Sequence, residues 1–167
     1  YRRHFYLGKA DGTKADFMRW RMCERAFNAA GGGKAACVFD AIGAAQVSKA
    51  SFAGMRVLHR LRQHTAIWPF MTLHADRPTV VEIYCRAYIR HAGLRGLKIR
   101  DLDGLNQALR GFDCDAFGGS AELSDDQTDV LITAAGLRRL ANQTEPWTPA
   151  GLTPEVARHE GWTFGVF

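Results

Sequence analysis

Apolar and polar residues recur along the chain with two different periods, which predicts both helices and strands. Apolar side chains at helical spacing predict helices over 15–29, 49–63 and 101–112. Short β-branched and aromatic runs predict strands over 67–70, 79–85 and 162–164. Strands separated by helices are typical of an α/β domain.

The second of these helices has a clear apolar pattern. Phe52, Met55 and Leu58 recur every three residues, so we expect them to form its core face. Arg56 and Arg60 are then expected on a solvated face.

A fourth helix is predicted to begin at Asp125. Ser124 is a good N-cap, and Gln127 three residues later completes a capping box, in which each side chain accepts a hydrogen bond from the other's backbone N–H. Asp125 and Asp126 then fall in the first turn, where the helix dipole favours each anion by about 0.3 to 1 kcal/mol.

Asp129 lies beyond the capping positions of this helix. The residues after it, 130–141, are mostly apolar, which predicts a helix buried on most faces. Residues at i and i+3 share a face, so Asp126 and Asp129 are expected to point the same way. A buried carboxylate without a partner is unfavourable, so we expect Asp129 to be paired or to bind a metal ion.

Glu82 interrupts the apolar run 79–85, which follows the turn residues Asp76 and Pro78. The run is typical of a central strand, in which glutamate is depleted. The alternative is an edge strand with Glu82 on its polar face, paired with Arg86.

Five segments, taken in order, resemble an uncharacterised family of predicted ribonuclease H-like nucleases, in a superfamily that includes bacterial Holliday-junction resolvases. The likeness extends from about residue 15 to the end of the chain. Its motifs are the segments 43–58, 67–70, 81–86, 124–129 and 160–166. The resemblance implies a mixed ribonuclease H-like sheet flanked by helices, and metal-dependent hydrolysis of phosphodiester bonds.

The resemblance also implies the site. Glu82 and Asp129 would be direct ligands of Mg²⁺ or Mn²⁺, with Asp126 as a further ligand or a neighbour of the ligands. Carboxylate oxygens suit Mg²⁺, and two ions can activate water and stabilise the leaving oxygen. Superfamily members usually carry a first catalytic aspartate on an N-terminal strand, and no residue before Asp40 fits. We therefore expect residues 1–167 to be a single domain, the C-terminal portion of such a fold that lacks its N-terminal strands. We expect this chain alone to be inactive or to bind metal weakly.

Charge is divided unevenly along the chain. Residues 1–100 carry 18 Lys and Arg against 6 acids, whereas residues 101–167 carry 4 against 11. Basic residues supply most sequence-independent affinity for nucleic acid, so Lys49, Arg56 and Arg86 are candidate contacts. A degenerate family member that binds nucleic acid or a protein through this Arg-rich half, without cleavage, is the alternative function. Nucleotide binding is disfavoured, because the glycines at 31–33 do not form a phosphate loop.

Length and composition are those of an ordinary single domain. The sequence has no apolar stretch of about 18 residues, so no membrane partner is expected, and the oligomeric state stays open. The cysteines are irregularly spaced and form no Cys-x-x-Cys pair, which favours reduced thiols and a cytoplasmic location.

Overall fold

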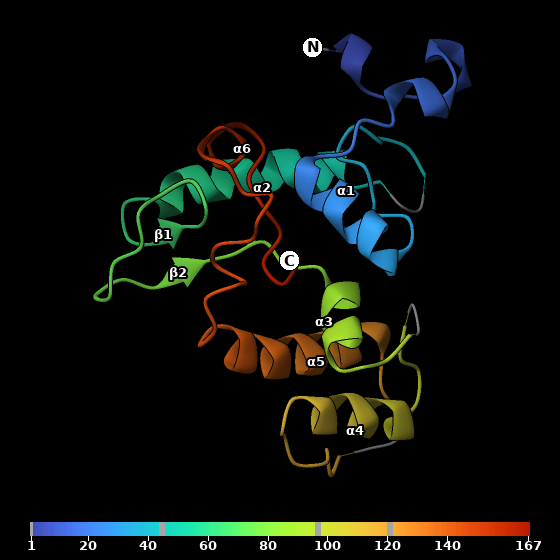
Figure 1. The fold of residues 1–167 in the computed structure, drawn as a ribbon. Helices are drawn as coiled ribbons and strands as arrows, with labels where there is room; N and C mark the ends of the chain where they lie inside the picture. Colours follow the sequence, from blue (N-terminus) through green and yellow to red (C-terminus); the bar gives the residue numbers. More distant parts are fainter. Residues whose placement is uncertain (1, 44–45, 96–97, 120–121) are drawn as a thin grey trace. The chain divides into compact units, whose positions relative to one another are not determined.

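The computed structural model of the protein describes residues 2–43, 46–95, 98–119 and 122–167, which form two compact units (Figure 1). The first unit comprises the residues up to Val81 together with Gly151–Trp162. The second unit comprises Glu82–Ala150 together with Thr163–Phe167. The single domain expected over residues 1–167 stays a prediction.

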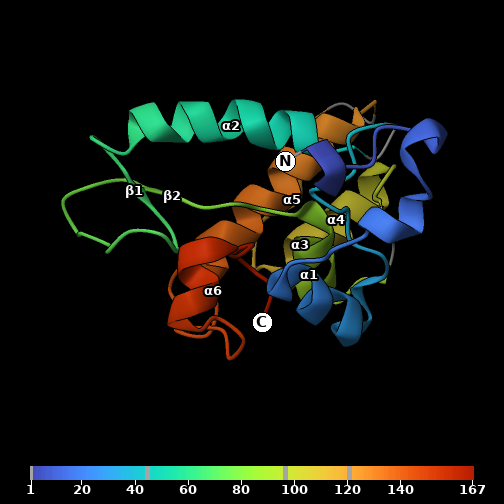
Figure 2. The ribbon, with the colours of Figure 1, turned by 90° about the horizontal axis from the view of Figure 1, so that it is seen from above.

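The first unit is mainly helical and contains a small parallel sheet. The strands β1 (Ala66–Ile67) and β2 (Thr79–Val80) pair with each other, and Figures 1 and 2 show them near the C-terminal end of the long helix α2 (Ser48–Leu61). The remaining helical elements are the 3-10 helices Arg2–His4, Lys9–Asp11 and Lys14–Phe17, then α1 (Met22–Phe27), the π-helical turn Asn28–Gly32 and α6 (Pro154–His159).

The start of α1 is fixed by two carboxylates. Glu24 accepts hydrogen bonds from the backbone N–H of Arg21 and from its guanidinium, both at 2.9 Å. A carboxylate oxygen of Glu160 accepts the N–H of Met22 at 2.6 Å, which ties the segment after α6 to α1. Both acids satisfy N–H groups that the first helical turn leaves free. Apolar side chains buried in this unit include Cys23, Phe27, Cys37, Ile67, Trp68 and Trp162.

The second unit is built around α5 (Asp125–Leu140), which contacts both α3 (Cys85–His91) and α4 (Leu102–Gly111). Figure 1 shows α5 between these two helices. The C-terminal segment joins this core, since the buried hydroxyl of Tyr88 donates to the carbonyl of Phe164 at 3.1 Å. Other buried side chains are Ile89, Leu105, Phe112 and Ile132.

The described residues combine helices with a small sheet, so the structure is α/β in this coarse sense. The predicted helices over 49–63 and 101–112 are confirmed as α2 and α4. The helix predicted over 15–29 is instead broken into a 3-10 helix and α1.

The central strand predicted over 79–85 is wrong. Only β2 is a strand, Glu82 makes an isolated bridge to Thr163, and a helix begins at Cys85. A central strand needs partners on both sides, and β2 pairs only with β1 among the described residues. The strand predicted over 162–164 is likewise reduced to the bridge at Thr163.

Candidate nucleic-acid interface and acidic residues

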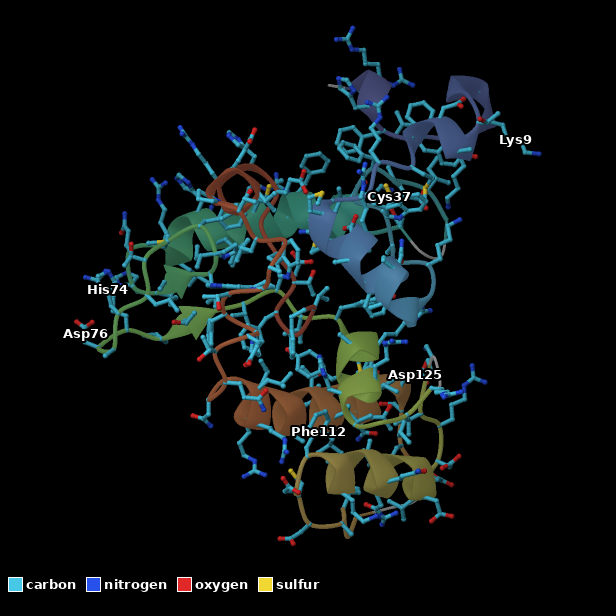
Figure 3. The ribbon with its side chains drawn as sticks, in the orientation of Figure 1. Lys9, Cys37, His74, Asp76, Phe112 and Asp125 are labelled. Atoms are coloured by element: carbon cyan, nitrogen blue, oxygen red, sulfur yellow. The ribbon has the colours of Figure 1, made fainter. Side chains whose placement is uncertain are left out.

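The acidic helix α5 begins where its sequence predicts. Ser124 Oγ accepts the N–H of Gln127 at 3.2 Å, and Gln127 Oε1 accepts the N–H of Ser124 at 2.9 Å. The predicted capping box and the start at Asp125 are therefore confirmed. Figure 3 labels Asp125 at this end of the helix.

The burial predicted for this helix is wrong. Asp126 and Asp129 are both exposed, and Val130 is 66% exposed. The helix packs one face against α3 and α4, and that face carries Thr128 and Ile132. Because Asp129 is exposed, water solvates its charge and burial does not force it to find a partner.

Glu82 is exposed and is joined to the C-terminal segment. Its carboxylate accepts a hydrogen bond from the Thr163 hydroxyl at 2.9 Å, and its backbone carbonyl accepts the N–H of Phe164 at 2.8 Å. Glu82 therefore anchors the end of the chain to the segment that precedes α3. The alternative edge strand does not include Glu82 either, because β2 ends at Val80. The predicted pairing of Glu82 with Arg86 stays a prediction.

An open groove of about 590 Å³ lies between the start of α3 and the exposed face of α5. Asp129 is among its lining residues, whereas Glu82 and Asp126 are not. The rest of the lining is mainly apolar with two cationic side chains, and consists of Ile83, Tyr84, Cys85, Arg86, Lys98, Val130, Thr133, Ala134 and Leu137.

Burial and nearby charges determine the pKa values of side chains in and beside the groove. Burial, followed by the nearby Asp129, raises the pKa of the Cys85 thiol to about 12, so it is a neutral thiol at pH 7. Burial also raises the pKa of Tyr84, and the charge of Arg86 opposes that effect. Lys98 forms an ion pair with Asp125 and lowers the pKa of that carboxyl. Neither the Cys85 thiol nor the Tyr84 hydroxyl is therefore activated as a nucleophile.

The three predicted metal ligands are not gathered into a group of ligands. No set of three His, Cys, Asp or Glu side chains able to hold a metal ion occurs in the described ranges. The residues present there do not by themselves fit a two-ion centre, which needs several carboxylates in one place. The predicted roles of Glu82, Asp126 and Asp129 stay predictions.

A second candidate site is the surface of α2 in the first unit. Lys49, Arg56 and Arg60 are exposed and lie at spacings of seven and four residues, so their side chains project from one edge of the helix. We call these three residues the cation stripe. The opposite side of α2 carries Ser51, Gly54 and Leu58, which are half-buried.

No acid opposes the cation stripe locally. Between Asp40 and Asp76 the sequence contains no Asp or Glu. Within the residues that the structure describes, none of the three side chains forms an ion pair or a hydrogen bond with another group. Their positive charges are therefore available to an external anion.

The structure corrects the predicted core face of α2. Phe52 is 48% exposed and Met55 is 54% exposed, whereas Leu58 is half-buried. The spacing of α2 also predicts a solvated face for Arg60, without assigning it a function.

Two signals in the sequence could have identified the stripe. They are the acid-free segment and the spacing of positions 49, 56 and 60. Arg86, the third predicted nucleic-acid contact, lies in the second unit and lines the groove.

Comparison of the chain with known protein families, curated proteins and solved structures gives no match. In the ranges that the structure describes, no helix is both long and apolar enough to cross a membrane.

Proposed function

We propose that this protein binds nucleic acid through the cation stripe of α2. The observation that carries the proposal is the exposed, unopposed row of Lys49, Arg56 and Arg60 within an acid-free segment. With a rise of about 1.5 Å per residue, the row spans about 16 Å along the helix. A strand with one phosphate every 3.4 Å or so would present several anions over that length.

If the stripe binds phosphates, the binding affinity should fall with salt concentration in a predictable way. Each neutralised phosphate of a single strand contributes about −0.7 to the slope of log K against log salt. Three contacts predict a slope of about −2, so affinity should fall roughly 20-fold between 50 and 200 mM salt. Fluorescence anisotropy with a labelled oligonucleotide measures this slope directly.

The critical variant replaces all three cations, Lys49→Gln, Arg56→Gln and Arg60→Gln. We expect this variant to lose most of its affinity at 50 mM salt, and its residual binding to vary little with salt. Retention of both the affinity and the slope would refute the proposal, as would absence of binding by the unaltered chain.

A matched control variant distinguishes the effect of the cation stripe from the effect of the protein's net charge. Lys9, Arg77 and Arg110 are exposed cations outside α2, and their replacement by Gln changes the net charge by the same amount. We expect this control variant to keep nearly all the affinity. An equal loss in both triple variants would show that net charge alone drives association.

Metal-dependent cleavage of nucleic acid by a ribonuclease H-like fold is the second candidate. Asp126 and Asp129 favour it, because both are exposed on α5 and their spacing allows them to approach one cation. An assay with Mn²⁺ compares the unaltered chain with Glu82→Gln and Asp129→Asn. Cleavage that both substitutions abolish, with binding retained, would support this activity. Equal activity in all three proteins would show that Glu82 and Asp129 are not needed for cleavage.

A further inference from the structure

We infer that the α2 surface selects single-stranded over double-stranded nucleic acid, with Phe52 as a stacking platform for a base. The inference rests on the proposed function, because it adds a base contact to the phosphate contacts of the cation stripe. It explains why a large aromatic side chain stays open to solvent beside three cations.

Phe52 lies next to the cation stripe on the helix. Positions 52, 56 and 59 follow the spacing i, i+4 and i+7, so Phe52, Arg56 and His59 form one row along α2. All three side chains are exposed. A strand held at Arg56 by a phosphate therefore brings its bases within reach of two rings.

The Phe52 ring is held in place by its own chain. Its centroid lies 5.4 Å from that of Phe5, and the Phe5 centroid lies 5.3 Å from that of Phe39. Phe5 contacts the Phe52 ring and Phe39 contacts Phe5, while 48% of Phe52 stays exposed. A ring that is already positioned loses little freedom when a base stacks on it.

The chemistry favours a single strand. In a duplex the faces of the bases are covered by their neighbours, whereas in a single strand a base can turn its face to an aromatic ring. Surfaces that combine cations with exposed aromatic side chains are typical of proteins that bind single strands without sequence preference.

The arrangement fits a membrane surface less well. A helix that lies on a membrane keeps its apolar residues on one face and its cations on the other. In α2 the exposed apolar side chains lie on both sides of the cation stripe, with Phe52 and Met55 on one side and Val57 and Leu61 on the other.

The test compares one labelled 12-nucleotide strand with its duplex, by anisotropy with the full chain at 50 mM salt. We expect the single strand to bind at least tenfold more tightly. Phe52→Leu keeps an apolar side chain but removes the ring, so it should weaken single-strand binding about fivefold or more and leave duplex binding unchanged. Val57→Ala, the control on the other side of the stripe, should change neither affinity.

Three results would overturn the inference. The first is equal affinity of the unaltered chain for strand and duplex, and the second is an equal loss for both in Phe52→Leu. The third is binding to vesicles of neutral and anionic phospholipid that Phe52→Leu abolishes, with no preference for the single strand. The proposed function fails separately, when neither strand nor duplex binds. Circular dichroism of each variant shows whether it is folded.

Discussion

Gly136 is the position where a single methyl group should disturb the second unit most clearly. A Cβ atom at this position in α5 would lie 2.3 Å from Cδ1 of Tyr88 and 3.1 Å from Cζ of Phe112. Tyr88 is fully buried and Phe112 is 1% exposed, so neither ring can swing into solvent to relieve the contact. The hydroxyl of Tyr88 is also held by the carbonyl of Phe164.

Two opposing effects set the magnitude for Gly136→Ala. Overpacking a well-packed core costs about 1 to 3 kcal/mol, and a contact this short between buried groups belongs near the upper end. Replacing glycine by alanine inside a helix returns about 1 kcal/mol. We therefore expect the free energy of unfolding of the second unit to fall by about 1 to 2 kcal/mol.

Gly54 provides the matched control, because it is also a helical glycine but its Cβ would meet no atom within 4 Å. Gly54→Ala in α2 should stabilise that helix by about 0.5 to 1 kcal/mol. Urea denaturation measures both variants, and hydrogen exchange of α2 and α5 peptides reports the two helices separately. A Gly136→Ala protein as stable as the unaltered chain would refute the close packing of α5 on Tyr88.

Three further predictions concern the second unit. Ser124→Ala should destabilise α5 by about 1 kcal/mol, because the N–H of Gln127 loses its acceptor; faster hydrogen exchange in the first turn checks this, and unchanged exchange contradicts it. Tyr88→Phe should lower the free energy of unfolding by about 1 to 2 kcal/mol, since the buried Phe164 carbonyl loses a donor, and a urea midpoint equal to that of the unaltered chain would count against it. Burial raises the pKa of both Tyr88 and Cys85, the latter to about 12, so folding favours their protonated forms. Stability should therefore be complete below about pH 9 and fall as the pH rises toward 12, and a melting temperature that stays constant over this range argues against the burial of these groups.

Local signals in the sequence are sufficient to place the start of α5. The capping box of Ser124 and Gln127 involves residues three apart, so no distant contact is needed to fix it. The helix over 101–112 was predicted from its apolar spacing, and the structure adds a cap of the same local kind, in which the Asp101 carboxylate accepts the N–H of Gly104 at 2.7 Å. Interactions within one helical turn are visible in the sequence because the partners are neighbours.

Strand pairing could not be predicted in the same way. The run 79–85 has the composition of a strand, but the pairing it finds stops at Val80, apart from one bridge 81 residues further along the chain. Composition records what a segment can form, whereas a sheet depends on partners from elsewhere in the chain. The hydrogen bond from the Thr163 hydroxyl to the Glu82 carboxylate is an example, because the strand pattern over 79–85 does not indicate a partner so far along the chain.

The periodicity of the sequence predicts which residues share a face of a helix, but it does not predict whether that face is buried. Asp126 and Asp129 are exposed on α5, and Phe52 and Met55 are exposed on α2. In α2 the spacing of the apolar residues predicts a buried face, and the structure covers a different side of the helix. In α5 the mostly apolar composition predicts burial on most faces, and the structure buries one face. Which side is covered depends on the elements that pack there, so the sequence pattern predicts the wrong environment for Asp129 and for Phe52.

The excess of basic residues over 1–100 also overstates what a phosphate would meet. Part of that charge is neutralised within the first unit, where Lys14 pairs with Asp40 and Arg21 pairs with Glu24. Paired cations contribute less to binding an anion, because an acid competes for them at close range. The number of cations without a nearby acid is therefore what matters for binding an anion. Such cations lie in the acid-free segment that contains α2. The cation stripe, rather than the net charge of the chain, is therefore the feature that should determine both affinity and its dependence on salt.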